Sequence, residues 1–255
     1  MNLMVSIVCE KFDSSDEIRQ GTIIKFIDKN LDDSYGIIVT GNCDIAQDKY
    51  GNFLSWCPIY SFEYYIDNFF IQTQCRKKVD RLKNSLKKEL STFFKVEQFN
   101  DNALDNFIAR TEDDLKKTIS SNELVKKIIE TRPFFHINKF DKSHFEALKL
   151  KFDGFSTLPG DKFFIDAIPD PSKEFENKNG FIVNLRRIKE IKIDSISKFY
   201  YYGTTECVAL AKLIAPYCQK MVQQLGSMFS DIGLPSEYEV KFKESKKYFV
   251  NGVKQ

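Results

Sequence analysis

The residues with the clearest chemical potential are a cysteine and an aspartate that stand side by side after an apolar run. The segment YGIIVTGNCDIAQDKYGNFLSWCPI begins at Tyr35, and its residues 36–39 resemble a buried strand that leads into Cys43 and Asp44. A thiolate nucleophile needs a nearby cation or helix N-terminus, whereas an adjacent carboxylate opposes ionisation of the thiol. We expect Cys43 to be a small buried side chain, and Asp44 to accept backbone N–H bonds from the turn or from a short helix starting at Ile45.

A catalytic dyad and a zinc site are two other kinds of site that use cysteine. A dyad of Cys43 with His136 or His144, the only histidines, stays open because such partners meet in the fold rather than along the chain. His136 is expected to point outward from a strand. The six cysteines are scattered and form no Cys-x-x-Cys pair, so the sequence predicts neither a zinc site nor a disulfide framework.

A strongly basic segment, RKKVDRLKNSLKKELSTFFK, runs from Arg76 to Lys95. Its apolar residues recur at spacings of three and four, which predicts one buried stripe of an amphipathic helix. The apolar residues are Val79, Leu82, Leu86, Leu90 and Phe93, and the cations are Arg76, Lys77, Lys78, Arg81, Lys83, Lys87, Lys88 and Lys95. Such cations neutralise phosphates without reading bases, so they predict salt-dependent, sequence-tolerant nucleic-acid binding. The alternatives are a solvated face, or a helix docked on the acidic helical segment 97–130.

Short β-branched and aromatic runs at 21–28, 36–40 and 53–60 predict strands, with a turn at Gly51. Strand patterns return at 132–140, 161–168 and 180–193. These runs predict an α+β fold with a small antiparallel, SH3-like β-barrel core built from residues 1–75 and 131–255. Residues 76–130 would form a helical insertion whose first helix is basic.

The last predicted element is a long helix that starts near Thr204, with Glu206 in its first turn. Pro216 should kink this helix, and Gly233 should end it at a C′ position. Its apolar residues lie on more than one face, so we expect it to be buried or to form a contact surface.

The composition is that of a globular protein of 255 residues, with 42% hydrophobic and 29% charged residues and a net charge of only +2. No apolar run is long enough for a membrane span, and no basic n-region precedes the first apolar segment, so we expect a cytoplasmic protein. No phosphate loop, dinucleotide glycine motif, nucleophile elbow or metal-binding histidine cluster occurs. We therefore predict no cofactor and no metal.

Two segments resemble a broad, uncharacterised bacterial family. IIVTGNCDIAQ is similar to its Cys-Asp strand-turn segment, and FIVNLRRIKEI with ALAKLIAPYCQKMVQQLGSMFSDIGLP is similar to its Arg-Arg strand and C-terminal helix. The similarity covers about half the chain, and this sequence has Asn184 where the family usually has Asp. The resemblance implies a link to phage-defence and mobile-element systems rather than a reaction. It also implies that Arg186 or Arg187, in opposite orientations on one strand, reaches Asp44.

The leading functional prediction is a non-catalytic accessory protein of a bacterial phage-defence system. It would dock a partner protein through its aromatic segments, 62–70 and 198–203, and its C-terminal helix, because aromatic residues are enriched at interfaces. The first alternative is nucleic-acid binding through the basic helix 76–95. The second is a hydrolase or nuclease that uses Asp44 and Cys43.

Overall fold

The computed structural model describes residues 6–27, 34–152, 158–170, 179–198 and 206–230. The chain divides into two compact units, which we call the sheet unit, Met1–Ser61 with Leu158–Gln255, and the helical unit, Phe62–Thr157. The helical unit is therefore longer at both ends than the predicted insertion 76–130.

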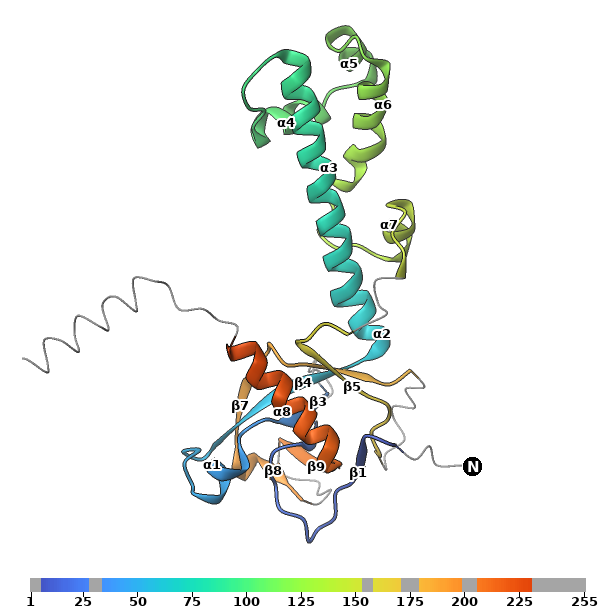
Figure 1. Cartoon of the computed structure of the whole chain (residues 1–255). Helices are drawn as coiled ribbons and strands as arrows, with labels where there is room; N and C mark the ends of the chain where they lie inside the picture. Colours follow the sequence, from blue (N-terminus) through green and yellow to red (C-terminus); the bar gives the residue numbers. More distant parts are fainter. Residues whose placement is uncertain (1–5, 28–33, 153–157, 171–178, 199–205, 231–255) are drawn as a thin grey trace, which may run out of the picture. The chain divides into compact units, whose positions relative to one another are not determined.

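The sheet unit is built on a curled, largely antiparallel half-barrel (Figure 1). Seven strands follow one another in the order β1-β9-β2-β3-β4-β6-β5, while β7 also pairs with β4 and β8 pairs with β9 in parallel. The strands are β1 Cys9–Lys11, β2 Thr22–Phe26, β3 Tyr35–Ile38, β4 Phe53–Ser61, β5 Lys162–Ile165, β6 Phe181–Asn184, β7 Lys189–Lys192, β8 Ile196–Ser197 and β9 Cys207–Leu213. The strands predicted at 21–28, 36–40, 53–60 and 161–168 are confirmed, and Gly51 has the expected positive φ of 58°.

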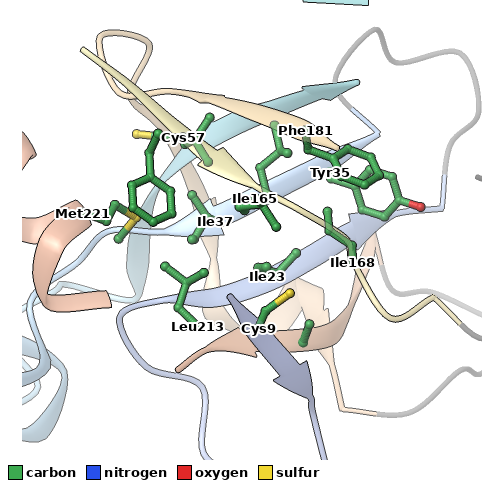
Figure 2. Packing of buried hydrophobic residues seen from close by; sticks show 14 of the residues in the cluster. Cys9, Ile23, Tyr35, Ile37, Cys57, Ile165, Ile168, Phe181, Leu213 and Met221 are labelled. Carbon is green, nitrogen blue, oxygen red and sulfur yellow. The ribbon is translucent and has the colours of Figure 1, made fainter. Parts of the chain in front are cut away.

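Each face of the curled sheet carries its own apolar cluster. One cluster includes Ile23, Ile37 and Val183, and the helix α8, Ala215–Ser230, packs on it through side chains such as Met221 (Figures 1 and 2). The other includes Ile24, Ile38 and Trp56, with Ile45 of the short helix α1, Asn42–Ala46, packed against it. Alternate residues of a strand point to opposite faces, which is how adjacent isoleucines contribute to different clusters.

The long C-terminal helix was predicted to start too early. Residues 207–213 form strand β9, which pairs with β1, β2 and β8, and helix α8 begins only at Ala215. Pro216 therefore lies in the first turn of α8, where a missing N–H breaks no helical hydrogen bond, and it does not interrupt the helix. The expected start at Thr204 and end at Gly233 lie outside the described residues.

Of the two other expected strands, the one at 132–140 was wrong and the one at 180–193 is confirmed only in part. Arg132–Phe134 is a turn of 3₁₀ helix rather than part of a strand, because Pro133 favours a helical start and removes a ladder donor. The segment 180–193 is split into β6 and β7 by a turn at Leu185 and Arg186, so Arg186 and Arg187 do not lie on a strand.

The helical unit is organised around one long helix, α3, Ile71–Phe94, which contains the predicted basic helix. Its buried residues include Val79, Leu86 and Leu90 of the predicted apolar stripe. The other elements are α2 Phe62–Tyr65, a π-helical turn Ile66–Phe70, α4 Asp101–Ile108, α5 Glu112–Thr118, α6 Asn122–Thr131 and α7 Lys142–Ala147. Side chains of Asn100, Thr111, Ser121 and Asp141 accept N–H bonds at the starts of α4, α5, α6 and α7, which explains why the short helices begin there. No helix in the described residues is long and apolar enough to cross a membrane.

Candidate functional site

Cys43 and Asp44 lie in α1, and both are exposed. Asp44 lies in the first turn of α1, and within the described residues no backbone N–H of the helix donates to its side chain. The Cys43 thiol lies 3.7 Å from Asp44 Oδ1. The expectation of a buried cysteine and an N–H-bonded aspartate was therefore wrong, since Ile45 is the residue of this turn that packs on the sheet.

The two arginines have partners other than Asp44. Arg186 Nε donates to Asp161 Oδ2 at 2.7 Å, and Lys162 Nζ donates to the same oxygen at 2.8 Å. Burial opposes the ionisation of Asp161, but these two hydrogen bonds outweigh it and hold the pKa of Asp161 below its usual value. Arg187 Nη1 donates to the hydroxyl of Tyr60 at 2.6 Å. The four residues Cys43, Asp44, Arg186 and Arg187 thus do not form the ion-paired cluster that the resemblance implied.

The two histidines lie in the helical unit. His136 is exposed but lies in a turn rather than on a strand, and His144 takes part in the capping box of α7 with Asp141. The His144 Nδ1 atom lies 2.6 Å from Asp141 Oδ1. In the parts of the chain that the structure describes, no three His, Cys, Asp or Glu side chains group together as metal ligands.

A buried polar cluster in the sheet unit was missed by the sequence predictions. Lys25 Nζ lies 2.9 Å from Asp170 Oδ2, and the hydroxyl of Tyr35 donates to the same oxygen at 2.7 Å. The Lys25 and Asp170 side chains are only 8% and 4% exposed. The sequence offers one indication of this cluster, because Lys25 stands between an isoleucine and a phenylalanine in a buried strand. No feature of the sequence indicates that Asp170 is its partner.

The basic residues of α3 fall into two groups. Lys87 forms an ion pair with Asp101, and Lys83 lies over the ring of Phe135, 5.4 Å from its centroid. The ion pair of Lys87 with Asp101 agrees with the predicted alternative that the basic helix docks on the acidic segment 97–130, whereas Lys83 contacts an aromatic ring. The second group, Arg76, Lys77, Lys78, Arg81 and Lys88, makes no ion pair within the described residues.

Three members of the second group lie along one side of α3. Lys77, Arg81 and Lys88 are exposed, and with about 3.6 residues per turn they lie within roughly 40° of one another around the helix axis. At a rise of about 1.5 Å per residue they span roughly 16 Å. This side lies opposite the stripe that contains Val79, Leu86 and Leu90. We call the three residues the cationic stripe.

The charge of α3 is not matched by the rest of the protein. The helix contains seven Lys or Arg residues and two acids, so its formal charge is +5. Because the whole chain carries +2, everything outside α3 carries −3. A modest overall charge therefore hides a concentrated positive surface, which is the kind of local field that attracts polyanions.

A groove of about 570 Å³ lies between α3 and α6 and meets the cationic stripe at Lys88. It is lined by Lys88, Glu89, Thr92 and Phe93 of α3, and by Ser121, Glu123, Leu124 and Lys127 at the start of and along α6. Lys127 donates to Glu89, which lowers the pKa of Glu89, so these two groups neutralise each other within the wall. Sequence reasoning placed Phe93 on the apolar stripe and missed the groove, because its two walls are about thirty residues apart.

In the comparisons with known proteins, no family model, no curated protein and no solved structure matches the chain.

Proposed function

We propose that the helical unit binds nucleic acid through the cationic stripe of α3. The observation that carries this proposal is that Lys77, Arg81 and Lys88 are exposed on one side of a helix and unpaired within the described residues. Other cations of the same helix, such as Lys87, do have acidic partners nearby. A cation without an intramolecular partner breaks no ion pair when it contacts a phosphate. Its contact also releases counterions from the nucleic acid, which favours binding.

The proposed contact is to the phosphate backbone and not to base sequence. Lysine is a flexible point charge, and a row of such charges along a helix positions a polyanion without a fixed pattern of donors and acceptors. The expected behaviour is sequence-tolerant binding that weakens steeply with salt. Fluorescence anisotropy of labelled DNA and RNA oligonucleotides at two salt concentrations tests the proposal, since absence of binding, or affinity that ignores salt, would contradict phosphate neutralisation.

The accessory role of a partner-binding protein in phage defence stays a prediction, as do the family resemblance, the cytoplasmic location and the kinship of the half-barrel with SH3-like barrels. α8 offers less to a partner than the sequence suggested, because Tyr217, Met221, Val222 and Leu225 pack on the sheet. The aromatic segment 198–203 lies largely outside the described residues. Phe229, with 53% of its surface exposed, is the large apolar side chain that α8 leaves accessible.

The hydrolase or nuclease alternative is supported less well than binding. Asp44 is exposed beside Cys43, and the described residues supply no cation or second carboxylate in contact with it. A general acid or base depends on a neighbour that adjusts its pKa, and a metal-dependent nuclease depends on grouped carboxylates.

A further inference from the structure

The groove between α3 and α6 continues the cationic stripe, and Lys88 belongs to both. A strand whose phosphates follow Lys77, Arg81 and Lys88 therefore reaches the mouth of the groove. The hydroxyl of Thr92 donates to the Lys88 carbonyl at 3.0 Å, so this polar side chain stands one turn further along α3 at the same mouth.

The chemistry of the groove suits a flat group with apolar faces and a polar edge. Phe93 is half-buried and Leu124 is buried, so both add apolar surface to the groove. Glu123 is exposed and makes no ion pair within the described chain, so its carboxylate is available to accept hydrogen bonds. Nucleobases have this character: their faces stack on aromatic rings, and the amino groups of cytosine, adenine and guanine donate to acceptors such as carboxylates.

We infer that the groove holds a base of a single-stranded nucleic acid whose phosphates lie along the cationic stripe. The inference rests on the proposed nucleic-acid binding and narrows its substrate class to single strands. A base inside a duplex is stacked and paired, and it reaches a groove only after extrusion, which costs free energy. A single strand presents its bases at no such cost and therefore binds more tightly than a duplex of equal length.

The groove is negative on one side, which fits a base better than a second phosphate. Glu123 would repel an anion, whereas Lys88 at the mouth attracts the phosphate that precedes or follows the inserted base. Lys127 and Glu89 already neutralise each other, so they do not compete for the ligand. The same distribution of charge disfavours an acidic peptide in the groove.

The test compares binding of the full chain to a labelled single-stranded DNA of about 12 nucleotides and to its duplex. The variant is Phe93→Leu, which keeps an apolar side chain and removes the aromatic face. The control is Phe107→Leu, because Phe107 is also a half-buried phenylalanine of the helical unit but does not line the groove. We expect Phe93→Leu to weaken single-strand binding by at least about fivefold and to leave duplex binding unchanged, as loss of one stacking contact requires.

A second measurement uses the unaltered protein and so does not depend on the folding of a variant. The fluorescence of 2-aminopurine placed in a single strand should change on binding, because a base that enters the groove no longer stacks on the adjacent bases of the strand. Equal affinity for single strand and duplex, an unchanged 2-aminopurine signal, or equal losses in the two phenylalanine variants would each overturn the inference. If those results came with salt-dependent binding that still required Lys77 and Arg81, nucleic-acid binding by the cationic stripe would be retained and base insertion would be refuted. Absence of all binding would refute both proposals.

Discussion

Neutralising the cationic stripe should abolish most nucleic-acid binding. The variant combines Lys77→Gln, Arg81→Gln and Lys88→Gln, which removes the three exposed cations on one side of α3 that make no ion pair in the described part of the chain. On a single strand each phosphate contact lowers the slope of log affinity against log salt by about 0.7, so three contacts give a slope of about −2. Affinity should therefore fall roughly 20-fold between about 50 mM and about 200 mM salt in the natural protein.

The same slope sets the size of the expected loss. At about 0.1 M salt each contact contributes roughly a fivefold gain in affinity, so the triple variant should bind about 100-fold more weakly. The assay is fluorescence anisotropy over a salt series, with circular dichroism to show that α3 still forms. All three side chains are exposed, so stability should change by less than about 1 kcal/mol.

A matched control makes the same change in net charge elsewhere in the helical unit. Lys116, Lys117 and Lys126 are exposed but are paired with Glu112, Asp114 and Glu130. Changing these three lysines to glutamine should alter affinity by no more than a few-fold and leave the salt slope near −2. Equal losses in the two triple variants would refute the reasoning, because binding would then follow net charge rather than the stripe.

Three further predictions concern the sheet unit and the caps. Asp170→Ala removes the carboxylate that contacts buried Lys25, so it should cost about 3–5 kcal/mol in urea unfolding; a loss below about 1 kcal/mol would show that this pair is not formed. Hydrogen bonds from Ser143 and from the His144 N–H hold the pKa of Asp141 at about 2, below its usual 3.8. The ionised form therefore stabilises the fold above about pH 4, and that contribution disappears as the pH falls towards 2; Asp141→Ala should remove this part of the acid dependence when unfolding is measured at several pH values. Burial raises the pKa of the thiols of Cys9 and Cys75 to about 11 and of Cys57 and Cys207 to about 12, and it also raises the pKa of the half-buried Cys218, whereas Cys43 is exposed. Folded protein should thus show one fast-reacting thiol towards a disulfide reagent, and a fast phase that survived in Cys43→Ser would contradict the placement of Cys43.

The sequence predicted those elements in which apolar residues recur with the period of a helix or of a strand. The apolar spacing of Val79, Leu86 and Leu90 revealed α3, and the β-branched runs before residue 61 revealed three strands of the sheet. The predictions were wrong where an element is buried on both faces, because apolar residues then follow one another without a period. β9 is apolar on both faces and pairs with three strands, so its sequence resembles a buried helix.

A bulge in β9 obscured its pattern further. Ile23 pairs with Ala211 while Ile24 pairs with Ala209, so Leu210 is an extra residue between them. Leu210 and Ala211 consequently contribute to the same apolar cluster although they are adjacent in sequence. No local pattern predicts where such a residue is inserted, because the bulge depends on the pairing partner.

The candidate site was predictable in its charges and not in its geometry. The sequence identified the cations of α3, but Lys87 and Lys83 differ from Lys77 and Arg81 only in what lies next to them in the fold. Cys43 and Asp44 were candidates because they are adjacent in sequence. In the structure both are exposed on α1, and Ile45 is the residue of this helix that packs on the sheet. Ion pairs between distant segments, such as Arg186 with Asp161, require the topology of the sheet.

The most direct test of the cationic stripe is lysine footprinting of the nucleic-acid complex. The protein is acetylated briefly with and without a saturating single strand, and the modification of each lysine is measured by mass spectrometry. We predict that Lys77 and Lys88 become protected while Lys116 and Lys117 keep the reactivity they have in the free protein. Unchanged modification of Lys77 and Lys88 in a fully bound sample would contradict the assignment of nucleic-acid binding to this side of α3.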